Sequence, residues 1–541
     1  MRSSRDSAPR SSRRPKAARP VNRDTGATDH VAWLPVVLRN AALGLAALYV
    51  LLYIVLAGLR LGYPFELEWM EGGAVDHVRR IIAGQGLYVP PSLEFVPFIY
   101  PPLYFYVSAL VARITGVGFL PLRMVSFAAS IGCFIMLFLI VRRETAARPA
   151  AAEAVRPADF AAANFAAVLA VGIFAACYRA AGAWFDIARV DSLALFLLLA
   201  AVWLLQRNAS LAAYLGAAAL VALAFLSKQI TLPMAAPLML FAARYRGRRG
   251  LLFVGAAIIL AGGSVLVLNH LTGGWYNYYI FRLPAEHPLL PDAIRDFWTR
   301  DLLWVLPIAL PAAIYFLAAK FAAPTRRGFF FWSAAGVGLV GGAWVSRVHV
   351  GGYDNVLMPA YAAVAMLSAM GAHTALTWAS GRPMPTLWRT EVAVYLLCIA
   401  QLGRLYYSPA QQLPTAGDRQ AWEQLVAIMK RIPGEVLMPE HGYLPSLAGK
   451  GAHAQGMAVF DVLRGGDEQA YERLAREFAN AVKERRFGAI IADQGTGLPP
   501  KIDTYYTGYM LPWPDDVLWP VTGMRTRPQY LYLPKRLAPD P

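Results

Sequence analysis

The chain has 541 residues, of which 57% are hydrophobic and only 16% are charged, and its mean hydropathy is +0.41. A soluble protein of this length needs far more polar surface, so the composition predicts a membrane protein with several spanning segments. The formal net charge of +17 does not indicate a nucleic-acid partner, because the basic residues gather in a tail and in short loops between apolar runs. The three cysteines show no disulfide or metal-ligand spacing.

Residues 1–32 are predicted to be a disordered basic tail on the cytoplasmic side. Residues 1–23 carry eight Lys and Arg against a single acid, Asp6, with Ser, Pro and Ala between them. A segment of this composition cannot bury a core.

Residues 33–405 are predicted to form the membrane domain. Runs of about 20 apolar residues are long enough to span a bilayer, and we count eleven, near 39–61, 119–141, 160–178, 191–206, 210–227, 229–243, 250–269, 302–320, 329–346, 355–378 and 390–405. Lys and Arg concentrate in alternate loops, which the positive-inside rule places in the cytoplasm together with the N-terminus. The opposite loops, including the first external loop 62–118, hold most of the acids.

One further apolar stretch, 99–116, is predicted to lie in the membrane interface. Counting it as a span would move the basic loop 142–156 to the outside, against the positive-inside rule. Its Tyr100, Tyr104 and Tyr106 suit the headgroup level.

Residues 406–541 differ in composition and are predicted to form a small extracytoplasmic α/β domain. The pattern indicates helices at 418–432 and 467–486 and strands at 435–438, 487–493 and 530–534. The predicted fold is thus an all-α polytopic bundle of about eleven helices, with a cytoplasmic N-terminus, followed by this domain.

Candidate chemistry begins in the first external loop, at FELEWMEGGAVDH (65–77), which carries Glu66, Glu68, Glu71 and Asp76. Glu68 and Glu71 are three residues apart, so a helix would place both on one face. Carboxylates there can take a proton from a hydroxyl group or hold a metal ion. The alternative is a solvated amphipathic helix with its acids facing water.

Two more charged groups lie at the outer ends of predicted spans. Arg189 and Asp191, with Asp186 nearby, stand at the head of an apolar run, where a charge is costly unless it is paired or faces water. The two could simply pair with each other. Lys228 lies outside, against the positive-inside trend, and needs an anionic partner, either a loop acid or a phosphate; the alternative is a snorkelling interfacial lysine.

The remaining candidates lie in two later external loops. Arg347, His349, Tyr353, Asp354 and Asn355 surround Gly351 and Gly352, which permit a tight turn close to a ligand. Loop 270–301 adds charged and imidazole groups among aromatic residues, an arrangement that fits sugar or headgroup contact or a plain interfacial belt: Arg282, Glu286 and His287.

Several motifs are absent from the sequence. It contains no Walker motif, no Gly-rich dinucleotide fingerprint next to a strand and no zinc signature. The two halves show no inverted repeat with broken helices, which weakens a secondary-transporter interpretation.

The order of motifs resembles the GT-C superfamily of integral-membrane glycosyltransferases, especially the polyprenyl-phosphate-sugar-dependent protein mannosyltransferases and the lipid A aminoarabinose transferases. An acidic first external loop is followed by GQGLY (84–88), YPPLYFYVSAL (100–110), GVGFLPLR (116–123), RVDSLALF (189–196), FLSKQ (225–229) and YDNVLMP (353–359). The resemblance covers roughly residues 40–405. Where the family has an Asp-Glu pair this chain has Met70-Glu71, and the family's Lys before Pro-Pro-Leu is Tyr100 here.

The resemblance implies an inverting transfer of a sugar from a polyprenyl-phosphate carrier to an acceptor hydroxyl. Glu71 or Glu68 would be the general base, with Glu71 preferred, and Asp191 the second acid. Lys228 and Arg347 would face the carrier phosphate, and the other substrate-binding candidates are Arg189, His349, Tyr353, Asn355, Tyr100 and Arg282. The resemblance implies no cofactor common to the whole family; in some branches the loop acid helps to coordinate a divalent cation, Mg²⁺ or Mn²⁺.

The implied partners are the lipid-linked donor, the bilayer and a glycan, lipid or protein acceptor, but no nucleic acid. The Arg- and Ala-rich composition is typical of a GC-rich bacterium, so we expect a multi-pass protein of the bacterial inner (plasma) membrane. The alternatives are a flippase or transporter of lipid-linked sugars, and a non-catalytic envelope assembly protein.

Overall fold

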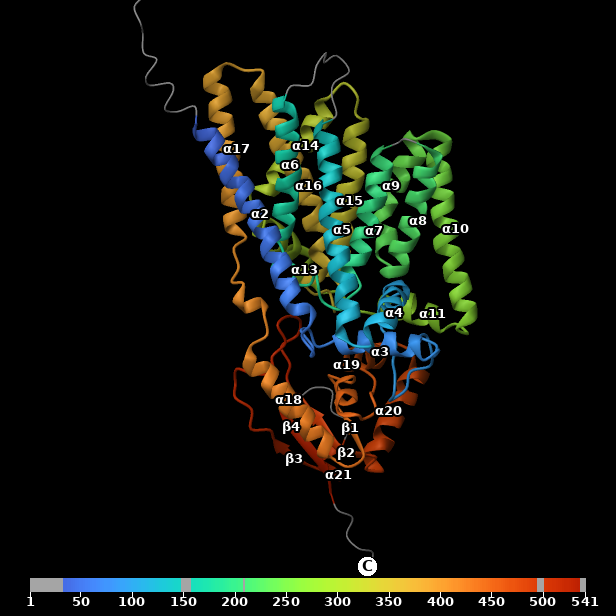
Figure 1. Ribbon diagram of the computed structural model, residues 1–541. Coiled ribbons are helices and arrows are strands. Elements are labelled where there is room, and N and C mark those ends of the chain that lie inside the picture. Colours follow the sequence, from blue (N-terminus) through green and yellow to red (C-terminus); the bar gives the residue numbers. More distant parts are fainter. Residues whose placement is uncertain (1–32, 147–156, 208–209, 494–500, 536–541) are drawn as a thin grey trace, which may run out of the picture.

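The computed structural model describes residues 33–146, 157–207, 210–493 and 501–535. Long helices form a bundle, a small α/β unit lies at one end of it, and short helices lie between the two (Figure 1). The predicted tail 1–32 lies outside the described residues.

Within the described residues, each predicted apolar run forms a helix. These helices are α2 (Leu34–Leu61), α5 (Phe119–Ala146), α6 (Pro157–Ala176), α7 (Asp191–Arg207), α8 (Leu211–Ser227), α9 (Thr231–Tyr245), α10 (Gly247–Leu271), α14 (Ala309–Ala322), α15 (Arg327–Arg347), α16 (Met358–Ser380) and α17 (Met384–Arg404). Five helical stretches of the described chain, at α2, α5, α10, α15 and α16, are long and apolar enough to cross a membrane by length and composition. The protein is therefore a multi-pass membrane protein, whereas the count of eleven spans stays a prediction.

One boundary differs from the prediction. The run 302–320 was expected to be helical throughout, but α14 begins at Ala309, and η2 (Phe297–Leu303) before it is π-helical. Pro307 has no N–H group and cannot continue a regular helix, which explains the interruption.

The bundle packs around α16, whose residues are mostly buried. Small residues let neighbouring helices approach closely, as is common between spanning helices. Ala46 of α2 lies directly against Gly172 of α6, and Met234 of α9 fills the space beside Gly342 of α15, so neither glycine has room for a side chain.

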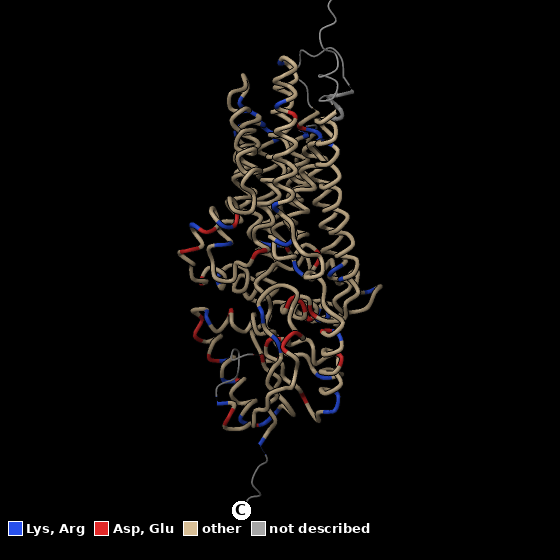
Figure 2. The backbone as a smooth tube through the Cα atoms, turned by 90° about the vertical axis from the view of Figure 1, so that its left-hand side faces the viewer, with Lys and Arg blue, Asp and Glu red and all other residues tan. Residues whose placement is uncertain are grey.

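Basic residues gather at the end of the bundle that faces away from the α/β unit, and the middle of the helices carries few charges (Figure 2). The C-terminal ends of α5 and α7 lie together there, because Arg143 Nη2 donates to the Arg207 carbonyl at 3.4 Å. Lys320, in the last turn of α14, pairs with Glu144 of α5 at 2.5 Å. This distribution is the one expected when the basic end is cytoplasmic.

Short elements connect the bundle to the α/β unit. They are α3 (Glu71–Ile82), α4 (Leu103–Thr115), α11 (Trp275–Asn277), η1 (Tyr278–Arg282), α12 (Leu283–Ala285), α13 (Pro291–Asp296) and η3 (Asp354–Leu357). Helix α4 corresponds to the predicted interfacial stretch, but only part of its tyrosine pattern faces outward. Tyr106 is exposed, whereas Tyr104 is buried and donates to the Leu122 carbonyl at 2.9 Å.

The C-terminal unit is an α/β domain, as predicted. It contains η4 (Ala410–Gln412), α18 (Ala416–Arg431), β1 (Glu435–Leu437), η5 (Leu444–Ala448), α19 (Gly456–Arg464), α20 (Glu468–Lys483), β2 (Phe487–Ala492), α21 (Ile502–Tyr505), β3 (Tyr506–Met510) and β4 (Tyr530–Pro534). In the described residues the strands form one sheet in the order β1-β2-β4-β3; β1 and β2 are parallel and the other pairs antiparallel. The sequence did not predict α19, α21 or β3.

The α/β domain shares a core with the loop 62–118, the loop that the sequence predicts to be the first external one. Phe65 stacks on Trp422 of α18 with ring centroids 5.9 Å apart. The connection between β3 and β4 returns to the loop, where the Thr522 N–H donates to the Leu67 carbonyl at 3.2 Å. The C-terminal domain is thereby held against the acidic stretch.

Candidate active site

A cavity of about 870 Å³ opens between the C-terminal domain and the ends of the helices that face it. Predicted site residues that line it are Glu68, Tyr100, Arg189, Lys228, His349, Tyr353 and Asn355. Aromatic rings form much of the remaining wall, among them Trp69, Phe98, Trp184, Phe225 and Phe281. Its size and its mix of apolar and charged walls suit a bound small molecule.

The acids of the first external loop are buried, contrary to the alternative of a solvated helix. Glu66, Glu68, Glu71 and Asp76 are each at most 4% exposed. Helix α3 begins at Glu71, so Glu68 lies before it. The two carboxylates therefore do not share one face of a helix, which differs from the expectation. Buried carboxylates need partners, and the partners differ from one acid to the next.

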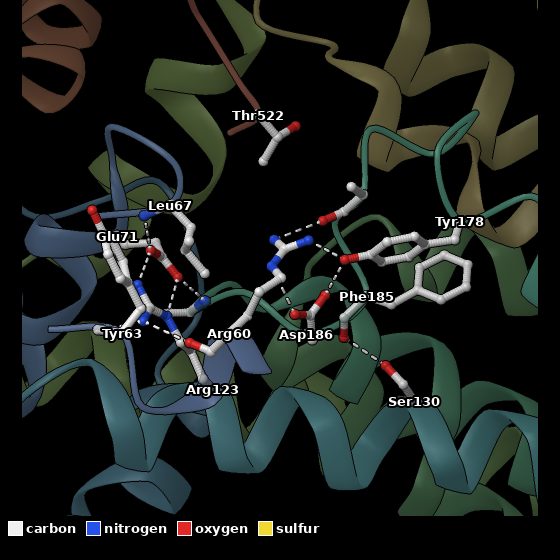
Figure 3. A network of polar contacts seen from close by, with 12 residues as sticks. Arg60, Tyr63, Leu67, Glu71, Arg123, Ser130, Tyr178, Phe185, Asp186 and Thr522 are labelled. Atoms are coloured by element: carbon white, nitrogen blue, oxygen red, sulfur yellow. Dashed lines mark hydrogen bonds and ion pairs between the residues drawn. The ribbon is translucent and has the colours of Figure 1, made fainter. Parts of the chain in front are cut away.

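Glu71 is held by Arg123 of α5 (Figure 3). Arg123 Nε donates to Glu71 Oε1 at 3.0 Å and Arg123 Nη2 donates to Oε2 at 2.6 Å. The backbone N–H groups of Leu67 and Ala188 donate to the same carboxylate, each at 2.7 Å. Burial would raise the pKa of Glu71, but Arg123 and the two N–H groups hold that pKa below its ordinary value.

Both oxygens of Glu71 are therefore occupied, and the residue does not line the cavity. Arg123 in turn donates to the carbonyls of Arg60, Tyr63 and Phe65. The pair ties the first external loop to α5 and to the loop before α7.

Asp186 also lies in a closed ion pair rather than in the cavity. Arg60 Nε is 3.1 Å from Asp186 Oδ2, and Tyr178 donates to Asp186 Oδ1 at 2.8 Å (Figure 3). Arg60 also donates to the Tyr178 hydroxyl and, at 3.2 Å, to the Ala183 carbonyl. This cluster fixes the loop 177–190 against the end of α2.

Glu68 lines the cavity, and its hydrogen bonding and pKa differ from those of Glu71. Among the described residues neither of its carboxylate oxygens accepts a hydrogen bond of regular geometry, and the Met70 N–H is the one backbone donor that acts on the carboxylate and lowers its pKa. Its charged partner is Arg189, whose Nη1 lies 3.6 Å from Oε2. Burial raises the pKa of Glu68 to about 8, although Arg189 opposes the shift. A carboxyl group with a pKa near the working pH is well placed for proton transfer.

Arg189 links Glu68 to the aromatic wall. Its Nη2 donates to the Tyr100 hydroxyl at 3.1 Å, and its guanidinium lies over the Phe98, Tyr100 and Trp184 rings. Arg189 and Asp191 do not pair with each other, which was the simpler alternative.

Asp191 is the partner that Lys228 required. Lys228 Nζ lies 2.5 Å from Asp191 Oδ1, Asn355 Nδ2 donates to the same oxygen at 2.8 Å, and Trp184 Nε1 donates to Oδ2 at 3.1 Å. Lys228 and Asn355 reach the cavity, whereas Asp191 lies behind them beside a separate small hollow. Asp191 orients the two groups that a ligand would meet.

Two predicted substrate-binding arginines lie outside the cavity. Arg347 Nε pairs with Asp301 at 2.8 Å and its Nη2 lies 3.3 Å from Asp354. Arg282 is half-exposed and pairs with Asp467 of the C-terminal domain at 3.2 Å. Both support loops around the cavity, while the neighbouring His349 and Tyr353 line it.

Sequence reasoning missed the contribution of the C-terminal domain. Met457, Asp461 and Arg464 of α19, with Gly523 and Met524, line the cavity. Asp461 is buried and lies 3.2 Å from Nε2 of His287. The only signal of this contribution in the sequence was the acid in MAVFDVLR (457–464). The apolar spacing of this segment is too short to predict a helix.

The carboxylates at the cavity do not fit a divalent cation. Within the described ranges, no three His, Cys, Asp or Glu side chains converge as metal ligands do. Glu68 and Asp191 each face a cationic side chain, which opposes a metal ion at the same place.

No family model and no curated protein sequence matches the chain. Solved structures do: ArnT from Cupriavidus metallidurans bound to undecaprenyl phosphate aligns with a TM-score of 0.56 and 13% identity, over 90% of this chain and 98% of that one. The apo form of the same protein gives a TM-score of 0.54 and 13% identity, over 91% of this chain and 98% of that one. The GT-C resemblance indicated by the motifs is confirmed at the level of the fold.

Proposed function

We propose that the protein transfers a sugar from a polyprenyl-phosphate carrier to an acceptor hydroxyl, with inversion, at this cavity. The observation that carries the proposal is that one cavity is lined both by Glu68, a buried carboxylate without a hydrogen bond to the described residues, and by Lys228, whose ammonium group is held by Asp191. The fold of ArnT, whose structure contains undecaprenyl phosphate, supports a lipid-phosphate carrier. The acceptor is a glycan, lipid or protein.

Glu68 is the general base in this proposal, in preference to Glu71. The acceptor hydroxyl loses its proton to Glu68 while its oxygen bonds to the anomeric carbon, and the bond from that carbon to the phosphate oxygen breaks. Polyprenyl phosphate leaves with the bonding electrons. Glu71 is unsuited because both of its oxygens already accept hydrogen bonds.

Lys228 and Asn355 face the carrier phosphate in this proposal. The ammonium group stabilises the negative charge that develops on the leaving oxygen, and Asp191 keeps it aligned. Arg189 and the aromatic wall hold the sugar between the phosphate and Glu68.

We place the protein in a bacterial plasma membrane with the cavity on the extracytoplasmic side. The basic loops at the opposite end of the bundle support this orientation (Figure 2).

Replacing Lys228 by alanine is expected to lower kcat/KM for the donor by about 10²- to 10³-fold, because the leaving phosphate loses its cation. Lys228→Arg retains part of the rate. Lys320→Ala is the matched control, since Lys320 also pairs with an acid at 2.5 Å but at the far end of the bundle; its activity stays within about 2-fold of wild type. Equal effects of the two alanine variants on kcat/KM would contradict the role of Lys228.

The rate of transfer is expected to rise with pH through about 8. Glu68 accepts a proton only when it is ionised, and burial raises its pKa to about 8. The measurement is kcat/KM between pH 5.5 and 9.5, which reports the pKa of the free protein, in a detergent that leaves the fold unchanged over that range. A rate that is flat from pH 6 to 9 argues against Glu68 as the base.

The test of the proposed function is turnover. Purified protein is incubated with a panel of polyprenyl-phosphate sugars and acceptor extracts, and released polyprenyl phosphate and glycosylated product are measured with and without Mg²⁺, Mn²⁺ and EDTA. Release of carrier from one donor supports the proposal, and the EDTA arm decides the cation requirement. Movement of intact donor across vesicles without its cleavage would favour a flippase instead.

A further inference from the structure

The connection between β3 and β4 crosses the cavity beside Glu68. We name residues 520–527 of this connection the strap. Thr522 pairs with Glu68 as a parallel β-bridge, and the Thr522 N–H donates to the Leu67 carbonyl at 3.2 Å. Gly523 and Met524 then form part of the cavity wall. A segment of the C-terminal domain thus runs directly along the proposed base.

Gly523 lies so close to the Glu68 side chain that a Cβ atom at this position would force that side chain to move. A Cβ atom at this position would lie 2.7 Å from Cγ and 3.0 Å from Oε1 of Glu68, well inside contact distance. Its φ of +85° is in the left-handed region that favours glycine. The backbone of Gly523 therefore covers the carboxylate where a side chain would push it away.

The strap is anchored on both sides of Gly523. The Thr522 hydroxyl donates to the Gly182 carbonyl in the loop before α7 (Thr522 is labelled in Figure 3). The Thr526 hydroxyl donates to Asp493 after β2. These bonds fix the strap to the bundle and to the sheet at once.

The C-terminal domain also contacts the acidic segment 65–77 at a second point. His441 Nδ1 contacts Glu66 Oε2, and His441 Nε2 lies 3.2 Å from Asp493 Oδ2. Burial lowers the pKa of His441, but Asp493 and Glu66 outweigh it and raise that pKa well above its ordinary value. His441 thereby holds Glu66, two residues before Glu68, against the C-terminal domain.

We propose that the strap is a positioning element of the active site: it excludes water from Glu68 and holds its carboxylate toward the cavity. This inference rests on the proposed function, in which Glu68 takes the acceptor proton. The C-terminal domain then completes the catalytic site rather than merely covering it.

The strap has a measurable consequence for the protonation of Glu68. The charged groups that face Glu68 are Arg189, Glu71 and Glu66, and the largest influence on its pKa is burial. Displacing the strap admits water and leaves these charges in place, so the pKa of Glu68 falls toward its ordinary range.

The first test does not depend on turnover. Infrared difference spectra of the full-length protein between pH 5 and 9 identify the Glu68 carboxyl band by its loss in Glu68→Gln. We expect a midpoint near pH 8 in wild type and a downward shift of at least about one pH unit in Gly523→Ala. An unchanged midpoint in a folded Gly523→Ala protein overturns the inference.

The second test uses transfer activity. Gly523→Ala is expected to lower kcat by about 10- to 100-fold with KM for the donor within about 3-fold, because the base is displaced while the phosphate contacts remain. Gly449→Ala is the matched control: its φ is also positive, at +75°, but open space surrounds it, so its kcat and pH profile stay at wild-type values. Equal losses in the two variants would assign the effect to backbone strain alone.

A milder variant tests the role of the strap if Gly523→Ala does not fold. Thr522→Val removes only the hydrogen bond to Gly182. We expect kcat to fall about 3- to 10-fold, and we expect the rise of the rate with pH to occur at lower pH than in wild type. A wild-type kcat and profile in Thr522→Val would overturn the inference. If wild type itself transfers no sugar but the infrared midpoint still shifts, the proposed function fails and the covering of Glu68 by the strap stands.

Discussion

Replacing Glu68 by glutamine is expected to reduce sugar transfer by about 10²- to 10⁴-fold, the usual contribution of a general base. Glutamine has nearly the same shape as glutamate and no charge, so the cavity wall stays intact while proton acceptance is lost. The measurement is kcat at pH 8.5, where Glu68 is largely ionised, with the donor that gives the highest turnover.

Two comparisons make this result specific. Glu94 lies in the same external loop, outside the cavity, and pairs with Arg486; Glu94→Gln is expected to keep wild-type activity. Glu68→Asp shortens the side chain and should retain a small part of the rate. A Glu68→Gln protein that transfers sugar at the wild-type rate would rule Glu68 out as the base.

Replacing Glu71 by alanine is expected to destabilise the fold by about 3–5 kcal/mol, the cost of breaking a buried ion pair by removing one partner. Arg123 would remain buried without its carboxylate, and the N–H groups of Leu67 and Ala188 would lose their acceptor. Activity would fall as well, but through loss of folded protein rather than loss of a base.

Thermal unfolding in detergent tests this expectation. Cys133, Cys177 and Cys398 are free and buried, so the labelling of thiols by a fluorescent probe reports unfolding directly. Glu423→Ala is the matched control, because Glu423 pairs with Arg419 at the surface and exposed pairs of this kind contribute under about 1 kcal/mol. A Glu71→Ala protein that unfolds at the wild-type temperature would contradict a structural role for the Glu71–Arg123 pair.

The two variants separate roles that the sequence could not. Glu68 and Glu71 lie three residues apart with similar flanks, and the motif resemblance favoured Glu71. The partner of Glu71 is Arg123, 52 positions later, and a contact over that distance leaves no local pattern. An arginine within an apolar run does predict a buried acidic partner, but several acids were available.

Helix positions were more predictable, and the reason is physical. A segment that crosses lipid must satisfy its backbone hydrogen bonds internally and be apolar over about 20 residues. Each long apolar run therefore predicts a helix. In the described residues each predicted run contains a helix, although the run 302–320 is interrupted. The error at 304–308 arose because apolar composition does not reveal the interruption at Pro307.

The sequence by itself determined the membrane class, the positions of the long helices and an α/β C-terminal domain, because these depend on local composition and periodicity. It also brought Glu68, Arg189, Lys228 and Asn355 to attention as external charged and polar residues. Tertiary structure decided which of the acids is left without a hydrogen bond at the cavity and which is locked to an arginine. It also decided that Gly523, far along the chain, covers Glu68, since burial and close approach depend on distant segments meeting in space.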